Sequence, residues 1–453
     1  MKKNLLIYLF VLLFLPAFSQ TEKGWMDLFN KKNLDGWIQK GGAAKYTVVD
    51  GAIVGETVPD SPNSFLCTEK EYGDFILELE LLVDTSMNSG IQFRSLSKPE
   101  YRNGVVHGYQ VEIDPSKRAW SGGIYDEQVR GWLYSLEINP EAKPAFKNGQ
   151  WNKYRIEAIG NTIKTWVNDI PTADIIDNAR ATGFIALQVH AINAKEKPWT
   201  LGTQVKWKNI RIMTQDLAKN RKKTTKEIVQ LNFIPNTISD YEKKNGWNLL
   251  FDGASTKGWR GVYKGKFPEK GWEVKEGELI VQASAGAEST NGGDIVTIEE
   301  FADFELIADF KITEGANSGI KYYVTEKENN KGSAIGLEYQ ILDDKNHPDA
   351  KLGRDGNRTV SSLYDLITAG NKRVNPIGEW NTARIVSKNK HVEHWLNGMK
   401  VLEYERGSKE FRDLVAASKY KDWPDFGEAP KGRILLQDHG NKVSFRSIKI
   451  RKL

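Results

Sequence analysis

From Trp25 onward the sequence is one pattern written twice, and this duplication constrains the fold more than any other feature. Residues 24–29 and the Gly-Trp pair at 36–37 return as residues 246–251 and the Gly-Trp pair at 258–259. Further matching pairs are Asp74-Phe75 with Asp303-Phe304, Asn88-Ser89-Gly90-Ile91 with Asn317-Ser318-Gly319-Ile320, Trp151-Asn152 with Trp380-Asn381, and Leu187-Gln188-Val189-His190 with Leu436-Gln437-Asp438-His439. A repeat of roughly 200 residues is a whole domain, because solenoid repeats have periods of about 20 to 50 residues. We therefore predict two related domains, whose shared residues serve the fold or a site.

The first 19 residues have the pattern of a secretory signal peptide. Two lysines precede an apolar run from Leu5 to Phe18, with an expected cleavage site just after it. No cysteine follows closely enough to carry a lipid, and no later stretch approaches the ~20 apolar residues that span a bilayer. We expect a periplasmic or secreted protein without a membrane anchor. Cys67 is the only cysteine, and we expect it to be a buried thiol.

Composition indicates where the domains begin and end, and the net charge limits the kinds of partner. We assign residues 20–213 to a first domain, 214–244 to a polar, lysine-rich linker with one short helix, and 245–453 to a second domain. The formal net charge of +5 is small for 453 residues, and the basic run at 219–223 falls in the linker. Nucleic-acid binding needs a dense basic face with interleaved aromatic residues. The sequence therefore predicts no nucleic-acid partner.

Strand patterns dominate both copies. In the first copy, apolar or alternating segments between Gly, Asn and Asp turns lie at 46–49, 75–82, 90–93, 109–113, 154–158, 163–167, 184–189 and 205–212. Many short strands with almost no helical periodicity indicate an all-β fold, with one antiparallel sandwich or jelly roll per copy. The clearest helical pattern, at 409–419, is an insertion peculiar to the second copy.

Polar side chains gather on the face of three strands that points away from the core. Successive side chains of a strand point to opposite faces of the sheet. In the first copy the polar set contains Gln92, Arg94, Gln110, Glu112, Asp114, Gln188 and His190, and in the second it contains Glu338, Gln340, Gln437 and His439. If these strands are neighbours, each sandwich presents amides, a carboxylate and an imidazole on one surface.

Such a surface suits a sugar, although an antiparallel sheet commonly has one solvated side without any ligand. Amides and carboxylates hydrogen-bond hydroxyl groups, and a neutral imidazole can accept a proton or bind a metal. Both copies keep the Gln-x-His pattern, at 188–190 and 437–439, where packing does not require it. The retention of this pattern in both copies favours a ligand-binding site over a solvated sheet face without a ligand.

The carboxylates do not fit an ordinary retaining glycosidase. That mechanism needs two carboxyl groups about 5 to 5.5 Å apart, which related sandwich hydrolases supply from one strand as Glu-x-Asp-x-Glu. Here the strands are Gln110-Val-Glu112-Ile-Asp114 and Glu338-Tyr-Gln340-Ile-Leu342, so neither has a carboxylate at both ends. Double displacement is disfavoured, and a second carboxylate from a distant loop stays open.

These motifs resemble the 3-keto-disaccharide hydrolase family over nearly all of both domains. The segments that carry the resemblance are 88–91, 108–114, 123–126 and 188–190 in the first copy, and 338–344, 362–366 and 436–440 in the second. The resemblance implies a concanavalin-like jelly roll and a glycoside substrate already oxidised to a ketone at C3. A C3 ketone acidifies the C2 hydrogen, so that one base can remove it, the group at C1 leaves by elimination, and water adds back. Such an enzyme needs a base and a group that stabilises the enolate, for which a divalent cation or an arginine would serve.

The resemblance also suggests roles for individual residues. Candidates for base or metal ligand are His190, Glu112, His439 and Glu338, with Arg94 stabilising negative charge. The expected substrate-binding residues are Gln92, Gln110, Gln188, Tyr125, Gln340, Gln437, Lys321 and Tyr364. Lys321 and Tyr323 stand where the first copy has Gln92 and Arg94, so equal activity of the two copies is in doubt. A lectin-like binding protein, a classical glycoside hydrolase and a structural envelope protein remain as alternatives.

Overall fold

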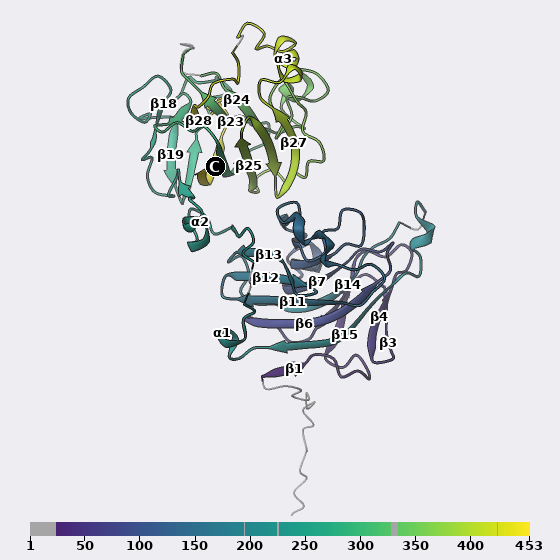
Figure 1. The fold of residues 1–453 in the computed structure, drawn as a ribbon. Helices are drawn as coiled ribbons and strands as arrows, with labels where there is room; N and C mark the ends of the chain where they lie inside the picture. The colour runs from purple at the N-terminus through teal and green to yellow at the C-terminus, as the bar shows by residue number, and fades with distance from the viewer. Residues whose placement is uncertain (1–23, 194, 224–225, 328–333, 424) are drawn as a thin grey trace, which may run out of the picture.

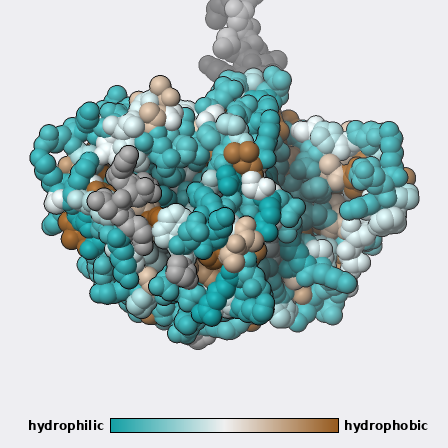
Figure 2. Space-filling model, turned by 90° about the horizontal axis from the view of Figure 1, so that it is seen from above, coloured by the Kyte–Doolittle hydropathy of each residue, from teal (hydrophilic) through white to brown (hydrophobic). Residues whose placement is uncertain are grey.

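The computed structural model describes residues 24–453 apart from 194, 224–225, 328–333 and 424, and it forms two β-rich lobes (Figure 1). The expected signal peptide at 1–19 lies outside the described residues. Within the described part of the chain, no helix has the length and apolar character needed to cross a membrane. Hydrophilic residues cover most of the face seen from above, with only scattered apolar ones (Figure 2).

The first lobe is a sandwich of two sheets. The larger sheet has the order β16-β13-β12-β11-β6-β15-β4-β3, with β1 paired to β15. The smaller sheet has the order β10-β9-β8-β7-β14-β5-β2. The strands are β1 Trp25–Asp27, β2 Trp37–Gly41, β3 Lys45–Val49, β4 Ala52–Glu56, β5 Ser64–Thr68, β6 Phe75–Val83, β7 Ser89–Leu96, β8 His107–Ile113, β9 Ile124–Glu127, β10 Gly131–Tyr134, β11 Asn152–Ile159, β12 Thr162–Val167, β13 Ile170–Ile176, β14 Phe184–Val189, β15 Gln204–Met213 and β16 Leu231–Asn232.

The second lobe repeats the same strand order. Its larger sheet is β19-β20-β29-β22-β25-β26-β27, with β17 paired to β29, and its smaller sheet is β18-β21-β28-β23-β24. The strands are β17 Asn248–Leu249, β18 Trp259–Gly261, β19 Trp272–Lys275, β20 Glu278–Val281, β21 Ile295–Thr297, β22 Phe304–Ile312, β23 Asn317–Val324, β24 Leu337–Leu342, β25 Asn381–Lys388, β26 His391–Leu396, β27 Met399–Glu405, β28 Arg433–Leu436 and β29 Val443–Lys452. Where the first lobe has the β9–β10 hairpin, the second has an irregular segment beside β24, in which the Tyr364 N–H donates to the Glu338 carbonyl at 3.0 Å.

The few helices are short. They are the α-helices α1 Leu217–Asn220, α2 Asp240–Lys244 and α3 Lys409–Ala416, and the 3₁₀ turns Arg102–Gly104, Pro140–Ala145, Pro198–Thr200 and Pro348–Lys351. The apolar sets of the alternating strands fill the space between the sheets, including Ile91, Val111 and Leu187 in the first lobe. Cys67 is fully buried, as expected. The predicted tandem of all-β jelly-roll sandwiches is therefore confirmed.

The repeated Trp-Asn motif has a structural role. The Asn152 Oδ1 atom accepts hydrogen bonds from the Lys147 N–H at 2.7 Å and from Asn168 Nδ2 at 2.7 Å. In the second copy, Asn381 Oδ1 accepts from the Asn375 N–H and from Asn397 Nδ2, both at 2.8 Å. The motif thus fixes the loop that leads into β11 or β25, which explains its retention without a site.

The segment between the sandwiches is built into both of them. Strand β16 pairs in parallel with β13 of the first lobe. Helix α2 begins with a capping box between Ser239 and Glu242, and the buried Glu242 carboxylate is ion-paired with Lys449 of β29. This segment contains two short helices rather than the one expected.

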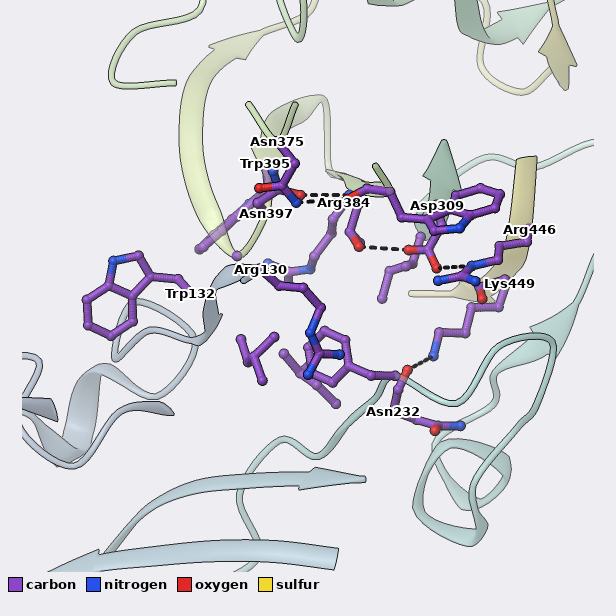
Figure 3. A pocket seen from close by; sticks show the side chains of 18 of the residues that line it. Arg130, Trp132, Asn232, Asp309, Asn375, Arg384, Trp395, Asn397, Arg446 and Lys449 are labelled. Carbon is purple, nitrogen blue, oxygen red and sulfur yellow. Dashed lines mark hydrogen bonds and ion pairs between the residues drawn. The ribbon is translucent and has the colours of Figure 1, made fainter. Parts of the chain in front are cut away.

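The lobes also contact each other directly. The Ser135 hydroxyl, just after β10, donates to the Gly398 carbonyl at 2.9 Å, and Trp132 of β10 packs in one apolar cluster with Met399. Beside this contact lies a pocket of about 100 Å³ that both lobes line (Figure 3). The Arg373 guanidinium of the second lobe lies 5.0 Å from the ring centroid of Tyr125 in the first. The second copy therefore covers part of the first copy's smaller sheet.

Candidate active site

The smaller sheet of the second lobe carries a compact polar surface at the wall of a cavity. In its register Lys321 lies opposite Glu338 and Gly319 lies opposite Gln340, while the Gln437 N–H donates to the Gly319 carbonyl at 3.0 Å. The four polar residues are at most 7% exposed. All four line a cavity of about 450 Å³. The polar residues predicted from alternation in β24 and β28 therefore do lie side by side, together with Lys321 of β23, which was predicted from its match to Gln92.

Gly319 forms the floor of this site. A Cβ atom at Gly319 would lie 2.3 Å from Glu338 Oε1, far inside van der Waals contact. The corresponding Cβ at Gly90 would lie 2.3 Å from the Gln110 side chain. In both copies a side chain from the neighbouring strand lies across this glycine, which explains why the Asn-Ser-Gly-Ile motif is retained.

The two charges of the surface affect each other. Burial raises the pKa of Glu338, and the positive charges of Lys321, Lys419 and His439 only partly oppose this effect. Burial lowers the pKa of Lys321, but the nearby carboxylates, Asp294 first, outweigh it, so its pKa is raised. Lys321 Nζ lies 3.8 Å from Asp294 Oδ2 and donates to the Ala334 carbonyl at 3.2 Å. Lys321 is thus a fixed cation beside a carboxyl group that binds a proton readily.

The insertion of the second copy supplies another wall of the cavity. Residues Lys419, Tyr420 and Trp423, in the turns that follow α3, all line it. Lys419 Nζ lies 4.2 Å from the ring centroid of Tyr364, which also lines the cavity. Burial lowers the pKa of Lys419, and the charge of Glu338 partly offsets this. The sequence analysis missed these residues, although an insertion ending in lysine and aromatic residues was a usable signal.

His439 projects from the core into the same cavity. Its side chain is 28% exposed, and its Nε2 atom lies 3.9 Å from Glu288 Oε2. The ring of His347 stands 5.9 Å from it, centroid to centroid, in an edge-to-face arrangement. Burial, followed by the charge of His439, lowers the pKa of His347. The cavity therefore brings together an imidazole and a carboxyl group, His439 and Glu338.

The first copy arranges its polar residues differently. Gln92 lies opposite Gln110, and Gly90 lies opposite Glu112. Gln92 and Gln110 thus occupy the places of Lys321 and Glu338, and Gln92 Nε2 donates to Gln110 Oε1 at 2.7 Å. A pair of amides replaces the lysine and the carboxyl group.

Glu112 corresponds to Gln340, one step along the strand face from the Glu338 position. Its carboxylate accepts hydrogen bonds from Asn88 Nδ2 at 2.7 Å, from Gln110 Nε2 at 3.1 Å and from Arg118 at 3.1 Å. Burial nevertheless raises the pKa of Glu112 to about 7. The carboxylate of the first copy is already surrounded by donors of its own domain.

The other residues of the first copy that we expected on this face differ in burial and in their contacts. Tyr125 lies opposite Gln110 in β9, beneath Arg373. Gln188 is fully buried, and within the part of the chain that the structure describes neither polar atom of its side chain has a hydrogen-bond partner. His190 follows β14 as a half-buried residue whose Nδ1 atom lies 2.7 Å from the Ala191 carbonyl oxygen.

The prediction that Arg94 shares this face is wrong. A β-bulge interrupts the pairing of β7, and Arg94 has a φ of 44°, which reverses the side-chain alternation. Its guanidinium donates instead to Asp74 Oδ1 at 2.9 Å and to the Gly73 carbonyl at 2.9 Å. Tyr323, with a φ of 57°, repeats the bulge in the second copy. Arg94 therefore serves the fold.

Residues with metal-binding chemistry occur in two places. His391, Glu393 and Glu403 of the β26–β27 hairpin have ligand atoms within 4.8 Å of one another, but Lys400 Nζ lies 3.5 Å from Glu393 Oε1. This cluster belongs to the larger sheet and does not line the cavity. Within the cavity, Glu288, Glu338 and His439 are suitable donors for a divalent cation, but they share the space with Lys321 and Lys419.

His394 departs from expectation, because we expected both His391 and His394, which lack counterparts in the first copy, to lie at the surface. It is fully buried, its Nε2 atom lies 2.8 Å from the Tyr322 hydroxyl, and burial lowers its pKa to about 4. It belongs to the core of the second sandwich.

Comparison with known proteins identifies one family for both copies. The family model described as a 3-keto-alpha-glucoside-1,2-lyase-like domain matches residues 24–213 and 246–451. A 3-keto-disaccharide hydrolase of Bacteroides thetaiotaomicron is 39% identical over 230 residues, which cover 46% of this chain and 79% of that protein.

Two crystal structures from Parabacteroides distasonis, of proteins with provisional glycosyl hydrolase assignments, were also found. One is 33% identical with a TM-score of 0.43 and covers 48% of this chain and 99% of its own. The other is 26% identical with a TM-score of 0.35 and covers 46% and 99%. Family membership therefore rests on the sequence matches.

Proposed function

The chain belongs to the 3-keto-alpha-glucoside-1,2-lyase-like family, and we propose that its second domain cleaves glycosides that carry a ketone at sugar C3. One observation supports this assignment above the others. The Glu338 carboxyl group lies across Gly319, opposite Lys321, at the wall of a cavity of about 450 Å³ that His439 also lines. The related protein from Bacteroides carries the name 3-keto-disaccharide hydrolase, which agrees with this substrate class.

Glu338 acts as the base in this proposal. The C3 ketone acidifies the hydrogen on C2, and a carboxylate with a raised pKa is a better proton acceptor than an ordinary one. Lys321, fixed by Asp294, places a positive charge where the enolate oxygen develops. His439 protonates the departing oxygen at C1, and water then adds to C1 to give the free 3-keto sugar. Glu288 and His439 could instead hold a divalent cation, which would stabilise negative charge directly, but His439 could not then protonate the leaving group.

Other residues hold the sugar. Gln340 and Gln437 each have a buried side-chain oxygen that finds no hydrogen-bond partner among the described residues, and both residues line the cavity. Sugar hydroxyl groups donate to such oxygens. The rings of Tyr364 and Trp423 also line the cavity and can pack against the apolar face of a pyranose.

The first domain does not cleave substrate in this proposal. It has an amide pair where the second domain has Lys321 and Glu338, and its own Glu112 is held by Asn88 and Arg118. A retaining glycosidase mechanism is also disfavoured, since the strand that carries Glu338 has Gln340 and Leu342 at the later positions.

We further propose that the protein acts in the periplasm or outside the cell, on the basis of the signal-peptide pattern at residues 1–19. Immunodetection in fractions of the cell that produces it would check this location. Recovery of the protein with its first 19 residues in the cytosolic fraction would contradict it.

The activity is tested by comparing a 3-keto disaccharide with its unoxidised parent. We expect release of a free 3-keto sugar from the first and no cleavage of the second, because only the ketone acidifies the C2 hydrogen. Cleavage of both compounds would favour a classical glycoside hydrolase. Binding of the 3-keto compound without release of product would favour a lectin-like protein.

A further inference from the structure

Lys419 differs from the other lysine of the cavity in how its ammonium group is held. Its Nζ atom lies 4.2 Å from the ring centroid of Tyr364 and 5.2 Å from that of Tyr420. Among the residues that the structure describes, none forms a hydrogen bond or ion pair with this atom. Lys321, by contrast, is tied to Asp294 and to the Ala334 carbonyl. The cavity therefore contains one fixed lysine and one whose amine lies beside two aromatic rings and has no hydrogen-bond or ion-pair partner among the described residues.

The backbone of Lys419 is nevertheless firmly positioned. Its N–H donates to Asp365 Oδ2 at 2.8 Å, and Asp365, which is 5% exposed, also accepts from Arg358 Nε at 2.7 Å. The side chain lines the cavity, and its amine is held only by the two ring contacts described above. This arrangement suits an amine that must reach a bound ligand.

The surroundings of Lys419 favour its neutral form. Burial is the main effect that lowers its pKa, and the positive charges of Lys321 and Arg358 add to it, against the opposite effect of Glu338. A lysine beside a second cation and removed from water is the usual origin of a nucleophilic amine. Arginine could not take this role, because it stays protonated.

We propose that Lys419 forms a covalent iminium with the C3 ketone of the substrate, and that this iminium receives the electrons released when the C2 hydrogen is removed. The proposal rests on the proposed function, since it concerns the same cavity and the same 3-keto substrates. It adds a catalytic residue that comes from the insertion found only in the second copy. The iminium then takes the electrons that the enolate oxygen beside Lys321 would otherwise hold, and the charge of Lys321 helps to keep the Lys419 amine neutral.

The steps balance without any further reagent than water. The Lys419 Nζ lone pair forms a bond to C3, and the ketone oxygen leaves as water to give the iminium. Glu338 takes the C2 proton, and the C–H electron pair forms an enamine, which then expels the C1 oxygen as an alcohol once that oxygen has gained a proton. One water adds at C1, C2 regains a proton, and a second water hydrolyses the C–N bond. The net reaction consumes one water and releases the alcohol and a free 3-keto sugar.

Reductive trapping tests this proposal on the whole protein. Cyanoborohydride is added near neutral pH together with a 3-keto disaccharide or its unoxidised parent, and the digested protein is examined by mass spectrometry. We expect a stable sugar adduct on the peptide that contains Lys419, formed with the 3-keto compound alone. Lys419→Arg should abolish the adduct and lower kcat at least a hundredfold, while its thermal unfolding stays like that of the wild type.

The matched control is Lys321→Gln, which installs the residue that the first copy carries as Gln92. This variant should still form the adduct on Lys419, although its turnover falls. An adduct on Lys321, or turnover of the wild type without any adduct, would overturn the role of Lys419 and leave the proposed function intact. Neither turnover nor adduct with the 3-keto compound would overturn both proposals.

Discussion

The two sandwiches share their strand order and their floor glycine, yet they place the carboxyl group at different positions on the same strand. In the second copy Glu338 faces Lys321 in an open cavity. In the first copy an amide pair takes that place, and Glu112 stands one step further along the strand face, among donors of its own domain. The same fold can therefore carry a carboxyl group that faces a cavity or one that is hydrogen-bonded within its own domain. The position of that carboxyl group on the strand distinguishes the two copies.

The insertion makes the second difference. Residues 409–423 supply a lysine and two aromatic side chains to the cavity of the second copy, and the first copy has no counterpart. In the first copy, Tyr125 lies under Arg373 instead. The side chains available to a ligand therefore depend on the insertion beside the polar face as much as on the polar face itself.

Replacing Glu338 should have the largest effect. Glu338→Gln removes the proposed base and keeps its shape, so we expect kcat to fall about a thousandfold for a 3-keto disaccharide. Glu112→Gln in the first copy should change kcat less than about twofold. Sugar release measured by chromatography would check both values, and equal losses in the two variants would break the comparison. The double variant Glu338→Gln/Gln340→Glu, which copies the pattern of the first domain, should remain inactive.

Glu112 and Asp114 of the first domain should affect the pH dependence of stability in different ways. The pKa of Glu112 is raised to about 7 in the folded state, so its contribution to stability is complete below its unfolded pKa and is lost as the pH rises through about 7. The loss amounts to about 3 kcal/mol at most. Thermal unfolding between pH 5 and 8 should show this decline in the wild type and a flatter profile in Glu112→Gln.

Asp114 provides the control for that experiment. Its pKa is lowered by Ser116 and Arg118, which together outweigh burial, so its contribution is already complete over the whole range from pH 5 to 8. Asp114→Asn should therefore reduce stability by a constant amount. A pH profile that stays unchanged in Glu112→Gln would show that this carboxyl group does not titrate as described.

The histidines should show the next largest contrast. His439→Ala removes the proposed proton donor to the leaving group, and we expect kcat to fall about a hundredfold. His190→Ala should leave turnover unchanged. A substrate with a more acidic leaving group should recover part of the rate in His439→Ala, because it departs without protonation. Equal rates of both variants with every substrate would remove His439 from the mechanism.

The floor glycines should give the smallest effects. Gly319→Ala and Gly90→Ala each force a side chain off the sheet, at a cost of about 1 to 3 kcal/mol of stability. Only Gly319→Ala displaces Glu338, so only this variant should also lose activity, by about tenfold. Calorimetry and kinetics on the same preparations would check the pair, and a similar loss of activity in Gly90→Ala would blur the distinction.

Much of the fold and half of the site could be predicted from the sequence, because regular strands obey a period of two. That rule placed Gln110, Glu112 and Gln188 on one face, and it would have placed His394 in the core with its strand neighbours Val392 and Leu396. It failed at Arg94, where a bulge reverses the alternation. Bulges have no reliable sequence signature, and tertiary contacts decide them.

Lys419 could not have been placed by the same rule. It follows a short helix in an irregular insertion, and its backbone N–H donates to Asp365, which is distant in the sequence, while its side chain lines the same cavity as Glu338. Periodicity describes neighbours along one element or one sheet. It gives no information about loops that return to a sheet from a distant part of the chain.

The contact of Arg373 with Tyr125 has a consequence for the history of the duplication. Tyr125 corresponds to Tyr364, which lines the second cavity, so the second copy packs on the position whose counterpart lines its own cavity. The first copy thereby supplies part of the surface on which the second copy rests, whether or not it binds a ligand. Loss of the first copy would remove this contact, so we expect the two copies to be retained together.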